Sequence, residues 1–351
     1  MKKTIILLMF IIVFCLTAYI NKIDVDNNNP NDFTIIDNNK SDITSNLSTN
    51  QTEDYENQQT KDEKEEVIPE SPKHTADETV EVVYNIKALS STLTGRKSLK
   101  PVKFTVKDPY NVIGLNKDKQ EFSFGAATEG KPHSLTVDNQ YIFDKYKTNA
   151  LAWDNKTNEK VLYLTFDCGY EYENLTSLML DTLKDKNVTG AFFVTMQYLQ
   201  EAPKVVARMI NEGHIVGNHS VNHPSNCAAL SREAMAKELL GVHNFLRVNY
   251  GYNSQYFRFP TGAYSQNAIE LVHSQNYRSV FWSIAHSDWD PENQPGVDIS
   301  FDTITSRLHP GAVILLHTTS PDNAKILGDF IDYARQQGYE FRTLDQYEHW
   351  R

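Results

Sequence analysis

The segment LTFDCGYE, residues 164–171, has the pattern of a buried strand that ends in a carboxylate, Asp167, and a thiol, Cys168. From residue 161 onward, short apolar strands alternate with segments of helical periodicity. Strands are expected at 161–166, 190–195, 215–218, 256–259, 279–284, 312–316 and 340–344, and helices at 175–186, 203–212, 232–248, 267–275 and 322–337. This alternation predicts an α/β fold with a parallel sheet, and seven strands favour a closed or nearly closed barrel over an open sheet.

Composition divides the chain into four segments. Two lysines followed by an uncharged apolar run predict that residues 1–21 are a signal peptide or a membrane anchor, and both interpretations stay open. Residues 22–78 are polar and poor in side chains that could bury surface, which predicts a disordered linker. Residues 79–157 are expected to form a partly β N-terminal extension, and residues 158–351 the main domain.

Charge and cysteine content exclude two classes of protein. A formal net charge of −11 over 351 residues argues against a nucleic-acid partner, because binding nucleic acid needs a clustered basic surface. Three cysteines are too few for a disulfide scaffold. Cys15 lies in the apolar N-terminal run, which leaves a Cys168–Cys227 disulfide as a minor alternative. We expect a monomer that meets a membrane only through residues 1–21.

Polar side chains with metal-binding or proton-transfer chemistry gather at the predicted strand ends. In barrels of parallel strands, chemistry is concentrated at the carboxyl ends of the strands. His219 and His223 stand four residues apart, close enough on a helical turn to bind one cation. Each residue alone has an ordinary interpretation, such as a helix cap or a core histidine, but the ordered set is improbable by chance. In chain order the set is Asp167, Cys168, His219, His223, Arg258, Asp288, Trp289 and His317.

These motifs resemble the polysaccharide deacetylase family, the NodB-homology carbohydrate esterases, over residues from about 120 to 351. The resemblance is carried by TFDCG at 165–169, HSVNH at 219–223, RFPTG at 258–262, Trp282 with DW at 288–289, and LLH at 315–317. Residues 169–171, 213–219 and 281–283 further resemble the subgroup of δ-lactam-forming de-N-acetylases that act on muramic acid in spore-cortex peptidoglycan. The resemblance implies a distorted (β/α) barrel and a hydrolase that cleaves acetyl amides with the help of a divalent metal.

The resemblance also implies a role for each motif residue. The metal would be zinc, because zinc takes imidazole and thiolate ligands readily, and manganese or cobalt are the alternatives. By this mapping Asp167 is the general base and Arg258 orients it, while His317 is the general acid and Asp288 orients it. His219 and His223 are the metal ligands, and the backbone N–H of Thr261 donates to the oxyanion. Tyr170 and Trp289 contact the substrate.

Two positions depart from the family pattern. Cys168 stands where an aspartate usually completes the metal site, and Ala285 stands where the fourth motif usually has a second aspartate. Three interpretations of Cys168 stay open: a zinc-ligating thiolate, a small buried filler beside a two-histidine site, or an oxidisable thiol. Gly169 is expected to let the chain turn away and keep the pocket open.

The leading hypothesis is an exported, anchored or secreted enzyme of the cell wall or spore cortex. It would remove N-acetyl groups from N-acetylmuramic acid of peptidoglycan, as a step to muramic δ-lactam. The alternatives are a deacetylase of N-acetylglucosamine or of an O-acetylated polysaccharide, and a catalytically weakened glycan-binding module.

Overall fold

The computed structural model describes residues 73–350. The signal or anchor segment, Cys15 and the linker up to residue 72 therefore lie outside the described residues. Between residues 73 and 350, no helix combines the length and the apolar character needed to cross a membrane.

One parallel sheet of eight strands organises the structure. Its strand order is β11-β5-β6-β7-β8-β10-β4, with β12 paired to β5, and every pairing is parallel. The strands are β4 (Ala150–Leu151), β5 (Val161–Cys168), β6 (Ala191–Val194), β7 (Ile215–Asn218), β8 (Tyr256–Phe257), β10 (Arg278–Val280), β11 (Ala312–His317) and β12 (Glu340–Phe341). The predicted α/β fold and all seven predicted strands are confirmed, and the short strand β4 is additional.

The barrel closes through irregular pairing after β10. The Ser283 N–H donates to the Val313 carbonyl over 2.8 Å, and the Leu315 N–H donates to the Ile284 carbonyl over 2.9 Å. The segment that follows β10 therefore lies against β11, and an isolated bridge joins Trp153 to Ala312. Because only a few bonds close the ring, the architecture is a distorted (β/α) barrel, as predicted.

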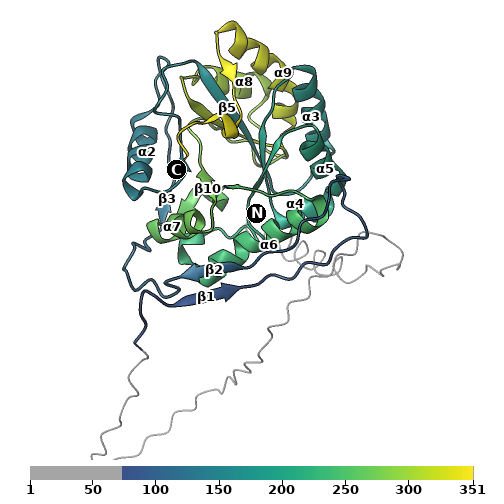
Figure 1. Ribbon diagram of the computed structural model, residues 1–351. Helices are drawn as coiled ribbons and strands as arrows, with labels where there is room; N and C mark the ends of the chain where they lie inside the picture. The colour runs from purple at the N-terminus through teal and green to yellow at the C-terminus, as the bar shows by residue number, and fades with distance from the viewer. Residues whose placement is uncertain (1–72, 351) are drawn as a thin grey trace, which may run out of the picture. The chain divides into compact units, whose positions relative to one another are not determined.

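Helices follow one another around the outside of this sheet (Figure 1). They are α2 (Ser134–Tyr146), α3 (Leu175–Asp185), α4 (Met196–Glu201), α5 (Pro203–Asn211), α6 (Arg232–Tyr250), α7 (Gln266–Ser274), α8 (Val297–Thr305) and α9 (Pro321–Gln336). The five predicted helices are confirmed to within two residues at each end. Sequence reasoning missed α2, α4 and α8. Helix α8 was missed because its residues, VDISFDTIT, largely alternate apolar and polar as a strand does, and because Gly296 gives it no side-chain cap.

Alternate residues of β5 face opposite layers. Val161 and Tyr163 belong to one apolar cluster, whereas Leu162, Leu164, Phe166 and Cys168 belong to a second cluster that includes residues of α3, α5 and α9. The strand period of two therefore sends Asp167 to the inner side and Cys168 to the helix side.

The N-terminal extension is partly β. Strands β1 (Thr79–Val82) and β2 (Phe104–Lys107) pair in antiparallel register and pack on α6. Buried Asn244 of α6 holds the segment before β2, since its side chain accepts from the Val102 N–H over 2.9 Å and donates to the Val102 carbonyl over 3.0 Å. A further antiparallel pair joins β3 (Gln120–Glu121) to β9 (Ala263–Tyr264).

Candidate active site

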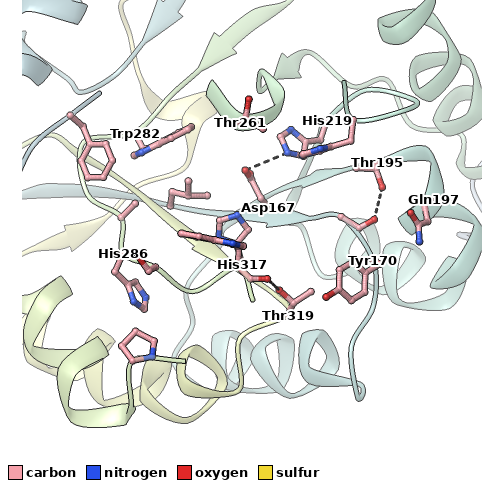
Figure 2. A pocket seen from close by; sticks show the side chains of 18 of the residues that line it. Asp167, Tyr170, Thr195, Gln197, His219, Thr261, Trp282, His286, His317 and Thr319 are labelled. Carbon is pink, nitrogen blue, oxygen red and sulfur yellow. Dashed lines mark hydrogen bonds and ion pairs between the residues drawn. The ribbon is translucent and has the colours of Figure 1, made fainter. Parts of the chain in front are cut away.

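The polar residues at the strand ends meet in one cavity of about 1320 Å³. Asp167 ends β5, His317 ends β11 and His219 follows β7, and all three line the cavity. Figure 2 shows Asp167 between His219 and His317. The fold thus brings these side chains together at the carboxyl edge of the sheet, as predicted.

Asp167 is buried and held by one ion pair. Its Oδ1 lies 2.9 Å from Nη1 of Arg258, and its Oδ2 lies 3.5 Å from Nε2 of His219. Burial by itself would raise the pKa of Asp167, but the Arg258 charge, with smaller contributions from His219 and His317, leaves this pKa below its ordinary value. Asp167 is therefore an ionised carboxylate at neutral pH, as a base for water must be.

Arg258 is fully buried and immobilised. Its Nε donates to the Val280 carbonyl over 2.9 Å, and its Nη2 donates to Oγ1 of Thr165 over 2.8 Å. The guanidinium also lies 4.3 Å from the centre of the Phe193 ring. Because every side of this cation is engaged, it can fix the position of the Asp167 carboxylate.

His219 and His223 lie beside each other, with ring centres 4.8 Å apart. Nδ1 of His219 is 2.9 Å from the Arg258 carbonyl, so Nδ1 carries the proton and Nε2 presents a lone pair. Burial lowers the pKa of His219 to about 4 and lowers that of His223 as well. The predicted helical turn is wrong: the backbones of Ser220 (φ 74°) and His223 (φ 49°) are left-handed.

His317 and Asp288 form a second charged pair. Nδ1 of His317 lies 2.7 Å from Oδ1 of Asp288, and the His317 backbone N–H donates to Oδ2 over 2.8 Å. Burial by itself would lower the pKa of His317, but the Asp288 carboxylate outweighs it and raises this pKa. The Asp288 carboxylate thereby favours the protonated form of His317, which can give up a proton.

Comparison with known proteins agrees with this geometry. A family model described as "Polysaccharide deacetylase" matches residues 154–280. The peptidoglycan-N-acetylmuramic acid deacetylase PdaA of Bacillus subtilis is 40% identical over 205 residues, which is 58% of this chain and 76% of that protein. The chain belongs to the polysaccharide deacetylase family. It is a hydrolase of a family whose members depend on a metal ion.

Solved structures of the family share the deacetylase fold. The structure of B. subtilis PdaA, a family 4 carbohydrate esterase, has a TM-score of 0.61 at 36% identity and covers 66% of this chain and 97% of its own. A family 4 carbohydrate esterase from Bacillus anthracis has a TM-score of 0.53 at 32% identity, with the same coverage. A peptidoglycan-N-acetylglucosamine deacetylase of Bacillus cereus is 32% identical over 203 residues, 56% of this chain and 70% of that protein.

The donor set of this deacetylase suits a metal through two imidazoles. Nε2 of His219 carries a free lone pair, and His223 is neutral beside it. Within residues 73–350, no group of three or more histidine, cysteine, aspartate or glutamate side chains is placed to hold a metal ion. The protein would therefore supply two nitrogen ligands, with water or substrate completing the coordination.

Cys168 does not join the histidines. Its side chain is fully buried in the cluster on the helix side of β5, and burial raises the pKa of its thiol far above the ordinary value. Because the Cys168 side chain packs in this apolar layer and no described group of three ligand side chains includes it, the structure favours a buried filler over a zinc ligand. Cys168 and Cys227 are both free, so the alternative of a disulfide between them is wrong.

The other predicted site residues lie on the cavity wall. Tyr170 is 38% exposed and Trp289 is 61% exposed, and both side chains line the cavity. Thr261 also lines the cavity and is held in a left-handed conformation, φ 56°. The expected role of Gly169 is wrong in one respect: its φ is not positive and an added Cβ would meet no atom within 4 Å, so the turn does not require glycine.

Sequence reasoning missed two side chains behind His317. Nδ2 of Asn323, near the start of α9, donates to Oδ2 of Asp288 over 2.6 Å, and Oδ1 of Asn323 lies 3.0 Å from Nε2 of His286. Nε2 of His286 is also 3.6 Å from Oδ2 of Asp288. Nothing in the sequence near Asn323 indicates chemistry, because Ser320 and Pro321 before it read only as a helix start.

Proposed function

We propose that this deacetylase removes the N-acetyl group from N-acetylmuramic acid in peptidoglycan, as a step towards muramic δ-lactam. The observation that carries the reaction type is the pair of opposed ion pairs in one cavity, Arg258–Asp167 and Asp288–His317. The 40% identity to PdaA supports muramic acid as the sugar.

The two ion pairs supply the base and the acid that amide hydrolysis needs. Asp167 takes a proton from a water molecule while the oxygen of that water forms a bond to the acetyl carbonyl carbon. His317 gives a proton to the amide nitrogen as the carbon–nitrogen bond breaks, so that acetate and the free amino sugar leave. Arg258 keeps Asp167 ionised, and Asp288 keeps His317 protonated.

His219 and His223 would hold the metal, and we propose zinc, with manganese or cobalt as alternatives. When bound, the ion would polarise the acetyl carbonyl and the attacking water. The backbone N–H of Thr261 is the proposed donor to the oxyanion. The exposed rings of Tyr170 and Trp289 are the proposed contacts for the sugar rings of the glycan strand.

The cellular setting follows from the substrate and the N-terminal sequence. Peptidoglycan lies outside the cytoplasmic membrane, and the chain opens with two lysines and an apolar run. We propose an exported monomer, anchored to the membrane or secreted, that acts on the cell wall or the spore cortex. Fractionation of cells, with an antibody to residues 73–350, would contradict this if the protein stayed in the cytoplasm.

The test is acetate release from defined peptidoglycan by the full chain. Intact and peptide-stripped glycan would be incubated with the protein and with zinc, manganese or cobalt. The glycan would then be digested, and the masses of the products measured by mass spectrometry. We expect acetate with the matching mass change on muramic acid, and release from Asp167→Asn that is slower by about 10³-fold. Absence of acetate from both glycans under all three metals would refute the proposal.

One alternative substrate has specific support. The 32% identity to a peptidoglycan-N-acetylglucosamine deacetylase favours glucosamine as the second candidate sugar. The same mass spectra separate the two, because deacetylated glucosamine and deacetylated muramic acid differ in mass and in fragments. Release from neither sugar would favour an O-acetylated polysaccharide as substrate or a glycan-binding module.

A further inference from the structure

We propose that Arg307 binds the carboxylate of the lactyl group of muramic acid and so selects this sugar over glucosamine. The inference rests on the proposed function and adds a specificity residue to it. Arg307 has no part in the acid, base or metal chemistry described above.

The α8 side of the cavity is built by one regularly spaced set of residues. Ile299, Thr303 and Arg307 all line the cavity, and Arg307 lies two residues beyond the end of α8. Residues four apart lie on one face of a helix, so this face of α8 and its extension is turned to the cavity. It presents the apolar side chain of Ile299, which is 60% exposed, then the hydroxyl of Thr303 and then the cation of Arg307.

Arg307 is the only lysine or arginine among the cavity-lining residues of the described chain. Its Nη1 donates to the Ala285 carbonyl over 2.8 Å, and no carboxylate of residues 73–350 lies within 4.0 Å as an ion-pair partner. The side chain of Ala285 has no carboxylate that could pair with Arg307. Arg258, by contrast, is buried and neutralised by Asp167. The cavity therefore has one partly exposed guanidinium without a countercharge.

The substrate chemistry matches this cation. Muramic acid differs from glucosamine by an O-lactyl group, which ends in a carboxylate once no peptide is attached. A guanidinium recognises a carboxylate by paired, charge-assisted hydrogen bonds, and glucosamine offers it no such partner.

A purely structural role makes a different prediction. If Arg307 only tied the chain at Ala285 to the end of α8, its loss would affect every substrate alike. Carboxylate recognition affects only substrates that carry the carboxylate.

The experiment compares three glycans with four proteins. The glycans are a peptide-free tetrasaccharide of alternating glucosamine and muramic acid, the same compound with its lactyl carboxylates converted to methylamides, and chitotetraose. The proteins are wild type, Arg307→Gln, Arg307→Lys and Arg335→Gln, the last of which removes a charge from the exposed end of α9. Circular dichroism and melting curves check that each variant folds.

We expect Arg307→Gln to raise KM for the carboxylate tetrasaccharide by about tenfold to hundredfold, with kcat little changed. KM for the methylamide should stay unchanged, Arg307→Lys should fall between, and Arg335→Gln should match wild type. An equal loss on all three glycans, or an unchanged KM on the carboxylate, would overturn the inference.

Two failures are distinguishable. If wild type releases acetate from muramic acid with the same KM for carboxylate and methylamide, this inference fails and the proposed function stands. If wild type releases none, the proposed function fails. Calorimetric binding of the two tetrasaccharides to wild type and Arg307→Gln then decides the inference: a carboxylate preference lost in the variant supports it, and equal binding refutes it.

Discussion

The two faces of β5 place neighbouring residues in unlike surroundings. Asp167 faces the cavity, where Arg258 and two histidines surround it, and Cys168 faces the apolar layer under the helices. Both residues are buried on the same strand, yet the pKa of Asp167 is lowered and the pKa of Cys168 is raised. Burial alone therefore does not decide the direction of a pKa shift, because the Arg258 charge outweighs it at Asp167.

The largest effect is expected from a substitution of Asp167 on the cavity side of β5. Asp167→Asn removes the base and leaves the Arg258 charge buried without its partner. We expect kcat for acetate release to fall by about 10³-fold, and the free energy of unfolding to fall by about 3 kcal/mol. Steady-state kinetics and urea denaturation measure the two. Activity within tenfold of wild type would show that another group takes the proton.

The next effect concerns the second ion pair. The Asp288 carboxylate raises the pKa of His317, so Asp288→Asn should lower that pKa. Since His317 must be protonated to act as an acid, the alkaline limb of the pH–rate profile should move to lower pH, and kcat at neutral pH should fall by about tenfold to hundredfold. An alkaline limb that stays in place would assign it to another group.

A smaller effect is expected on the outer face. Cys168→Ala deletes one buried sulfur atom from the apolar cluster, which should lower the free energy of unfolding by about 1–2 kcal/mol. Metal content, measured by elemental analysis, and acetate release should both remain as in wild type. Joint loss of metal and activity would instead make Cys168 a ligand and overturn its placement on the helix side.

The last effect is a pH dependence of stability that comes from three buried histidines outside the two ion pairs. Burial lowers the pKa of His214, His243 and His309 to about 4 each. The unfolded chain takes up these protons near pH 6.5, so stability should fall as pH drops from about 6.5 towards 4, by about 1–3 kcal/mol per histidine. Melting temperatures measured across this range check it. His214→Gln should flatten the decline, and an unchanged slope would exclude His214.

The sequence predicted most of the helices and strands but missed features that depend on tertiary contacts. Apolar runs and helical periodicity predicted all seven strands and five helices, because buried strands and amphipathic helices leave strong local patterns. Helix α8 was missed since its sequence largely alternates like a strand, and its helical form depends on packing against α9. Asn323 and Arg307 were missed because their function depends on neighbours that are distant in the chain.

The sequence by itself determined the parallel α/β order and the set of polar residues at the strand ends. In parallel folds these ends share one edge, so their chemistry could be inferred before any geometry was known. Only the tertiary structure decided which side of β5 each residue faces, which carboxylate pairs with which cation, and which cation is left without a partner. Those outcomes depend on distances between strands, which the order of residues along one strand does not contain.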